Sequence, residues 1–211
     1  MFEFPFDLLI LVAAGLFAGF VNTMAGGGSL LTLPLLIFFG LPPATANGTN
    51  RIAIFVSTSS ATLGFRSKNV NSFPFSIYLG ITAFLGALIG ARIAVEIDGL
   101  LFNKILAIIM MVVVVLMVFK PNYKSELLKP KTTGKTLIWS MIAFFFIGIY
   151  GGFINAGIGF IIMLFLNYVN KLDLVRVNAT KVALVFIYTT GALATFVLSE
   201  HINLKYGVAL A

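Results

Sequence analysis

Long apolar stretches separated by short polar breaks run along the whole 211-residue chain. A helix needs about 17 to 25 mostly apolar residues to span a bilayer, and several stretches approach that length. The hydropathy pattern predicts apolar segments at 8–24, 29–40, 47–65, 73–95, 100–119, 137–155, 158–169, 178–199 and from about 204 onward. The pattern therefore predicts an all-α polytopic membrane protein.

Two of these segments, 29–40 and 158–169, are too short to cross a bilayer. At 1.5 Å per residue each would reach about 18 Å, whereas the hydrocarbon core is about 30 Å thick. Each follows a glycine cluster, and a glycine inside a helix costs roughly 0.5–1 kcal/mol relative to alanine. We therefore expect discontinuous half-helices that begin after Gly-rich breaks.

The sequence around the first break recurs around the second. The stretch GLFAGFVNTMAGGGSLL from Gly15 aligns with GIYGGFINAGIGFII from Gly148, which pairs Asn22 with Asn155. After a deletion of two residues, ANGTN at 46–50 aligns with VNATK at 177–181. The chain crosses the membrane an odd number of times between equivalent points if each short segment either crosses or returns as a hairpin. The sequence thus predicts two inverted-topology repeats, an architecture found in many secondary transporters.

The repeat divides the chain into a first transmembrane unit at 1–119, a basic loop at 120–135 and a second unit at 136–211. The first unit has five apolar segments and the second has four, the last of them cut off in NLKYGVALA. We therefore expect the second unit to be truncated at its C-terminus and the native chain to be roughly 40 residues longer.

Composition and charge support the membrane class and suggest an orientation. Hydrophobic residues make up 60% of the chain and charged residues 10%, against about 25% charged residues in soluble domains. Lys and Arg gather in cytoplasmic loops, which places 66–69 and 120–135 in the cytoplasm and 96–99 outside. The chain has no cysteine and one histidine, His201, so we expect neither a metal site nor a cofactor, and the net charge of +7 does not imply nucleic acid.

The glycine clusters are candidates for anion binding. A half-helix that begins inside the membrane exposes unpaired N–H groups and the positive end of its dipole. The candidate groups are Gly26, Gly27, Gly28 and Ser29 in the first unit, and Gly157 and Gly159 in the second. The alternative is that these glycines only allow close helix packing.

Polar residues near the breaks extend this candidate site. Asn22 and Asn155 could satisfy backbone groups freed by the breaks or donate to a ligand, and Asn50 could donate as well. Arg51 and Lys181 bring a cation to the start of two helices, where it opposes the helix dipole unless an anion compensates. The alternative for both cations is that they reach to the lipid headgroups. The predicted helix caps are Asn47, Thr49, Asn178 and Thr180.

The motif GFVNTMAGGGSLLTLPLL followed by ATANGTNR resembles the sulfite exporter TauE/SafE family of membrane transporters. The resemblance covers essentially the whole chain, although AGIGF replaces AGGGS in the second copy. It implies a multi-pass protein of the bacterial inner membrane that carries small sulfur-containing anions such as sulfite or organosulfonates.

We therefore interpret the chain as a secondary transporter, and an exporter by its resemblance, with a small anion and the lipid bilayer as partners. An anion channel is one alternative, because half-helix termini can also form a selectivity filter, and a carrier of small carboxylates is another. A membrane enzyme is disfavoured because the apolar segments lack cysteine, histidine and paired carboxylates. Substrate identity, coupling ion and oligomeric state stay open.

Overall fold

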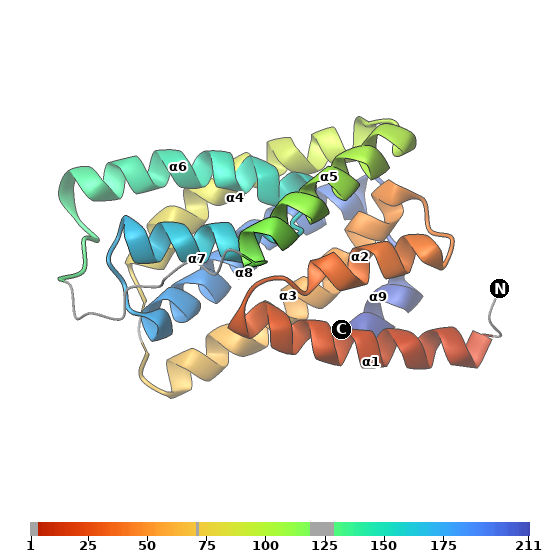
Figure 1. The fold of residues 1–211 in the computed structure, drawn as a ribbon, viewed down its shortest axis with the longest axis horizontal. Coiled ribbons are helices and arrows are strands. Elements are labelled where there is room, and N and C mark those ends of the chain that lie inside the picture. The colour runs from red at the N-terminus through yellow and green to blue at the C-terminus, as the bar shows by residue number, and fades with distance from the viewer. Residues whose placement is uncertain (1–3, 71, 119–128) are drawn as a thin grey trace.

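The computed structural model describes residues 4–70, 72–118 and 129–211 of the chain. Within these residues the regular structure is helical and contains no strand (Figure 1). The helices are α1 (Phe4–Met24), α2 (Ser29–Phe38), α3 (Pro43–Ser67), α4 (Phe75–Glu96), α5 (Gly99–Val118), α6 (Gly134–Phe153), α7 (Ile158–Tyr168), α8 (Leu174–Leu198) and α9 (Leu204–Leu210).

These helices match the predicted apolar segments one for one, which confirms the all-α membrane class. Candidate spans, long and apolar enough to cross a bilayer, are Phe6–Met24, Phe75–Glu96, Gly134–Phe153 and Leu174–Leu198. Helix α6 begins two residues before the predicted start of the second unit, and most of the predicted loop at 120–135 lies outside the described residues.

Helix α4 lies along α6 and α8 and runs in the same direction as both (Figure 1). Its contacts with α6 are made through small residues, because Gly86 and Gly90 meet the backbone of α6 while Gly148 of α6 meets the backbone of α4. Small residues let two membrane helices approach to backbone contact, where dispersion forces and weak polar contacts act over many atoms. This small-residue contact forms one side of the bundle.

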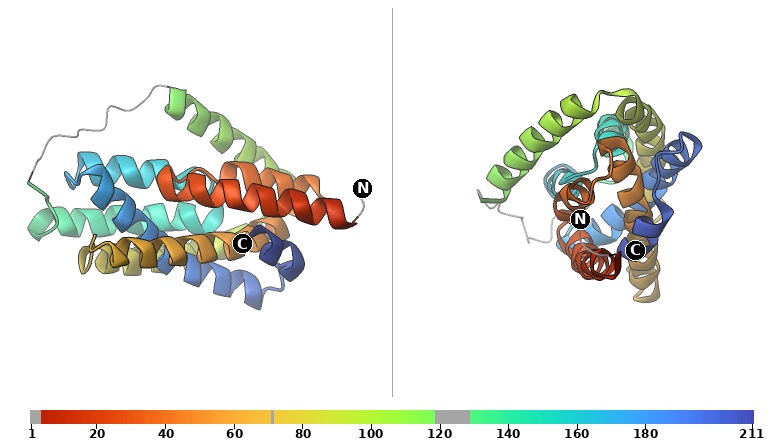
Figure 2. Two further views of the ribbon diagram at one scale, coloured as in Figure 1. Left: turned by 90° about the horizontal axis from the view of Figure 1, so that it is seen from below. Right: turned by 90° about the vertical axis from the view of Figure 1, so that its right-hand side faces the viewer.

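Helices α3 and α8 pack antiparallel, with the rings of Phe55 and Phe186 at 5.1 Å between centroids. The short helix α9 lies beside α1, where the backbone of Leu210 touches Gly15. Helix α5 runs obliquely along the outside of the bundle (Figure 2). The packing thus leaves α3 and α8 in the interior, next to both glycine clusters.

The helices that the repeat alignment pairs run in opposite directions in the two halves of the chain. Figure 1 shows α1 running toward the left end of the bundle and α6 toward the right end, and α3 and α8 are opposed in the same way. The short helices α2 and α7 begin in the middle of the bundle and run to opposite ends. Each short helix therefore returns alongside the helix that precedes it.

Charged residues separate between the two ends of the bundle. One end carries the segments 66–70, 129–133 and 170–176, where Lys131 and Asn170 exchange backbone and side-chain hydrogen bonds at 2.8 and 3.0 Å. The other end carries 96–99 and 199–203, and there Arg92 pairs with Glu96 at 3.1 Å, as an i, i+4 spacing allows. The described basic loops thus share one end, and the acidic loops share the other.

Candidate functional site

The two breaks in the chain meet in the middle of the bundle. Helix α1 ends at Met24 and α2 begins at Ser29, while α6 ends at Phe153 and α7 begins at Ile158. The Gly159 N–H donates to the Gly26 carbonyl oxygen at 3.3 Å. Segments far apart in the sequence therefore form one central crossing point.

Glycine is required at this crossing by both space and backbone conformation. A Cβ atom on Gly159 would collide with the backbone of Gly26, and a Cβ atom on Gly26 would collide with Gly159. Gly26 has a φ of 80° and Gly157 a φ of 70°, in the left-handed region where glycine carries no steric penalty. At the point where the two breaks cross, these glycines therefore do allow close packing, which was the alternative to anion binding.

The starts of the two short helices differ in how their N–H groups are used. Asn22 Oδ1 accepts a hydrogen bond from the Gly28 N–H at 2.8 Å, so its side chain spans the first break. Among the described residues, the N–H groups of Gly27 and Ser29 form no hydrogen bond. The start of α2 therefore keeps donors available, as an anion site at a helix start requires.

Asn155 links the second break to the first. It has a φ of 62°, and its Nδ2 donates to Ser29 Oγ at 3.3 Å. The hydroxyl of Tyr188, a fully buried residue of α8, donates to Asn155 Oδ1 at 2.6 Å. A second tyrosine, Tyr150, donates to the backbone carbonyl of Ala156 in the same break. Tyr188 thus supports the site residue Asn155, whereas Tyr150 bonds only to the backbone of the break, and the sequence analysis missed both.

The two cations lie deep in the helices that carry them and not in the first turn, which corrects the predicted placement. Arg51 is 0% and Lys181 1% exposed, so neither reaches to a lipid headgroup. Arg51 Nη2 donates to the Gly152 carbonyl oxygen at 2.8 Å, and Lys181 Nζ donates to the Thr23 carbonyl oxygen at 3.0 Å. Each cation thus caps the C-terminal end of the broken helix from the other half of the chain, where the helix dipole favours positive charge.

The predicted helix caps are also wrong, because α3 and α8 both begin earlier in the sequence than predicted. Helix α3 begins at Pro43 after Pro42, and α8 begins after Asp173, whose side chain accepts from the Arg176 N–H at 3.0 Å. The predicted caps lie one turn or more inside these helices. Two of them serve tertiary contacts instead, because Asn47 donates to Phe153 and Thr49 accepts from Asn203. Asn178 accepts from Lys181 within α8, and Thr180 borders the end that carries the basic loops.

A small cavity of about 20 Å³ lies beside the crossing point. Its polar lining comes from Asn22, Asn155, Lys181 and Thr58, with Gly26 and Gly159 and with apolar side chains of α3, α7 and α8. A space of this size holds about one water molecule. Of the eleven predicted binding residues, five line this cavity: Asn22, Gly26, Asn155, Gly159 and Lys181. The other six do not line it: Gly27, Gly28, Ser29, Asn50, Arg51 and Gly157.

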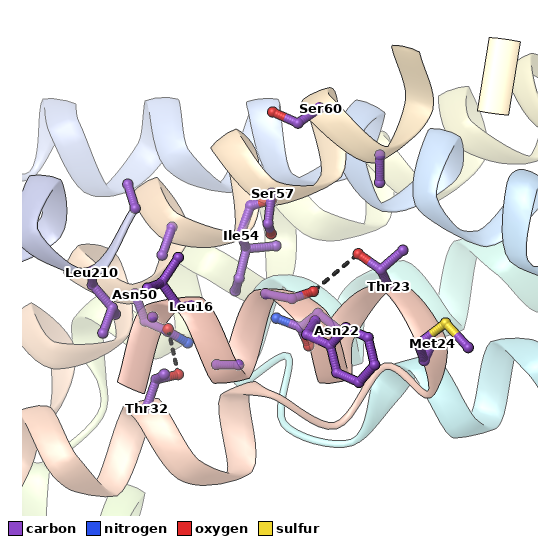
Figure 3. A pocket seen from close by; sticks show the side chains of 17 residues that line it. Leu16, Asn22, Thr23, Met24, Thr32, Asn50, Ile54, Ser57, Ser60 and Leu210 are labelled. Atoms are coloured by element: carbon purple, nitrogen blue, oxygen red, sulfur yellow. Dashed lines mark hydrogen bonds between the residues drawn. The ribbon is translucent and has the colours of Figure 1, made fainter. Parts of the chain in front are cut away.

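Asn50 lies instead on a larger groove of about 430 Å³ between α1, α3 and the end of α9. Figure 3 shows its amide accepting from the Thr32 hydroxyl at 2.7 Å, while Asn22 lies in another part of the groove. The rim is formed by apolar side chains such as Leu16 and Phe20, which are 75% and 68% exposed. A rim of this kind suits hydrocarbon better than a small anion, so we place the candidate site in the smaller cavity.

Comparison with known proteins identifies the family. The model of the family described as Sulfite exporter TauE/SafE matches residues 11–211 of the chain. The chain belongs to the TauE/SafE family. This confirms the resemblance carried by the glycine motif.

The TauE/SafE relatives have names that describe membrane transport. A probable membrane transporter protein of Haemophilus influenzae is 30% identical over 97% of this chain and 80% of its own length. The probable membrane transporter protein ORF9 of a Sinorhizobium species is 25% identical over the whole chain and 80% of its own length, and YfcA of Escherichia coli is 30% identical over 74% of the chain and 57% of its own. No solved structure matches the chain. As a TauE/SafE member with these relatives, the chain is a membrane transporter.

Proposed function

We propose that the protein is a secondary transporter, acting as an exporter, that carries small sulfur-containing anions such as sulfite or organosulfonates. The observation that carries this proposal is the central cavity, which is bordered by the start of α7, two amide side chains and a buried lysine. The family description supplies the substrate class.

The charge at the cavity favours an anion. Lys181 borders the cavity, and its Nζ bonds to Thr23 O, Asn178 Oδ1 and Met163 Sδ, which are all uncharged groups. No acidic side chain of the described residues lines the cavity. A lysine inside a bilayer costs about 2.5–3.5 kcal/mol on insertion scales, and a bound anion would offset part of that cost.

The opposed directions of the two halves support inverted-topology repeats with discontinuous half-helices. With the basic loops in the cytoplasm, as is usual for a bacterial inner-membrane protein, α2 and α7 would enter the bundle from opposite sides. The binding site would then lie near the bilayer midplane, between the two halves.

The size of the cavity supports a mechanism that involves movement. A space for about one water molecule is too small for sulfite, so we infer that the site must widen before it can hold the anion. We infer that the two halves separate at the Gly26–Gly159 contact to admit the anion from one side and release it to the other. Alternating access of this kind distinguishes a carrier from a channel.

The test is sulfite counterflow in proteoliposomes that contain the full-length transporter. Vesicles loaded with unlabelled sulfite are diluted into trace labelled sulfite, with sulfate and lactate in parallel. We expect transient accumulation of label with sulfite. Lys181→Met should raise the sulfite concentration that half-saturates counterflow by about ten- to a hundredfold, because a hydrogen bond to a charged group contributes about 1.5–3 kcal/mol.

The matched control is Arg92→Gln, which removes one positive charge at an exposed position remote from the cavity and should leave counterflow unchanged. Flux without counterflow would identify a channel. Counterflow with lactate alone would replace the substrate class, and unchanged half-saturation in Lys181→Met would refute the proposed site.

A further inference from the structure

We propose that Tyr188 is a positioning residue for anion selectivity. Its hydroxyl holds the oxygen of the Asn155 amide, so that the NH₂ group of the amide is the end available to an anion. This inference rests on the proposed function and adds to it a residue that determines specificity. An amide side chain can present either an acceptor oxygen or a donor NH₂ group, and only the second suits an anion.

The orientation of Asn155 is set by its two partners. The Tyr188 hydroxyl donates to Oδ1 at 2.6 Å, which places the amide oxygen toward α8. Nδ2 is thereby directed to Ser29 Oγ at 3.3 Å, at the head of α2, and one amide hydrogen is left over. If the amide were flipped, its NH₂ group would donate to the Tyr188 hydroxyl and its oxygen would face Ser29, so the direction of the Tyr188 hydrogen bond decides which end of the amide meets a ligand.

Asn22 is fixed in the same sense by a different donor. Its Oδ1 accepts from the Gly28 N–H at 2.8 Å, so its NH₂ group is also the end available to a ligand. Both amides line the cavity together with Lys181. Asn22, Asn155 and Lys181 thus border one small space, and each amide oxygen accepts a hydrogen bond from another group.

Tyr188 itself does not line the cavity, so its effect must pass through Asn155. It is fully buried in α8. Its equivalent in the first unit, Ser57, donates to the Ile54 carbonyl oxygen at 3.1 Å, and the Gly28 N–H fixes the Asn22 amide instead. Without the hydroxyl, the Asn155 amide is free to rotate and to present an oxygen, which repels an anion.

A double-mutant cycle on the full-length transporter tests this coupling. Binding of sulfite is measured by titration calorimetry for the wild type, Tyr188→Phe, Asn155→Ala and the double variant. We expect Tyr188→Phe to weaken sulfite binding by about three- to tenfold, and the double variant to bind no more weakly than Asn155→Ala alone. Additive effects would overturn the proposal, since Tyr188 would then act independently of Asn155.

Tyr150→Phe is the matched control, because it removes another tyrosine hydroxyl from the same break without touching Asn155. It should bind sulfite within about twofold of the wild type. Asn155→Asp gives a second test that does not depend on how Tyr188→Phe folds. The carboxylate still accepts from Tyr188 but has no NH₂ group, so sulfite binding should be lost, and retained binding would contradict the proposal. If the wild type neither binds nor exchanges sulfite, the proposed function fails together with this inference; wild-type binding with an additive cycle refutes only the role of Tyr188.

Discussion

At the scale of single residues, Asn47 shows how α3 holds the end of α6. Its Nδ2 donates to the Phe153 carbonyl oxygen at 2.6 Å, and its Oδ1 accepts from Arg51 at 3.4 Å. Asn47→Ala would leave a buried carbonyl and a guanidinium N–H without these partners. We expect the free energy of unfolding in mixed micelles to fall by about 1–3 kcal/mol.

Ser59→Ala is the control on the same helix. Its hydroxyl donates to the Val56 carbonyl oxygen at an exposed position, so its removal should change the free energy of unfolding by less than about 0.5 kcal/mol. Equal stability of Asn47→Ala and Ser59→Ala would show that the stability of the protein does not depend on the hydrogen bond from Asn47 to the end of α6.

Which residues gather at the site was partly predictable. The repeat pointed to Asn22, Asn155 and Lys181, because polar side chains are costly inside a membrane and these lie near the glycine clusters in both units. Tyr188 carried no such mark, because its role depends on how α8 packs against the second break. The cap prediction failed because segments chosen by hydropathy leave out a first helical turn that is polar. Pro43 and Asp173 are ordinary signals of a helix start, and they mark where α3 and α8 begin.

At the scale of helices, lengths and breaks follow from the sequence, whereas packing partners do not. Gly86 and Gly90 of α4 and Gly148 and Gly152 of α6 are each four residues apart, a spacing typical of close helix contacts. The spacing does not say which helix meets which. That choice depends on the shape of the whole bundle.

The α4–α6 contact gives a prediction at this scale. A Cβ atom on Gly90 would collide with the Ile149 carbonyl oxygen, so Gly90→Leu must push the two backbones apart. We expect a loss of about 1–3 kcal/mol or more in the free energy of unfolding and a smaller monodisperse fraction in size-exclusion chromatography. Gly64→Leu places the same side chain on α3 where nothing lies within 4 Å, and it should elute like the wild type. Similar elution of both variants would mean that α4 and α6 do not pack at these glycines.

At the scale of the whole molecule, the inverted arrangement predicts that equivalent positions of the two repeats face opposite sides of the membrane. Ser67 ends α3 and Ser199 follows α8, at nearly equivalent places in the two repeats, and the proposed inversion puts them on opposite sides of the membrane. Because the chain has no cysteine, Ser67→Cys and Ser199→Cys can each be labelled without background. In intact cells an impermeant maleimide should label Ser199→Cys, and it should label Ser67→Cys only after the membrane is opened, as the basic residues Arg66 and Lys68 require. Labelling of both from the same side would exclude inverted repeats and the midplane site built on them, whereas a clean reversal would retain the repeats and overturn only the assigned orientation.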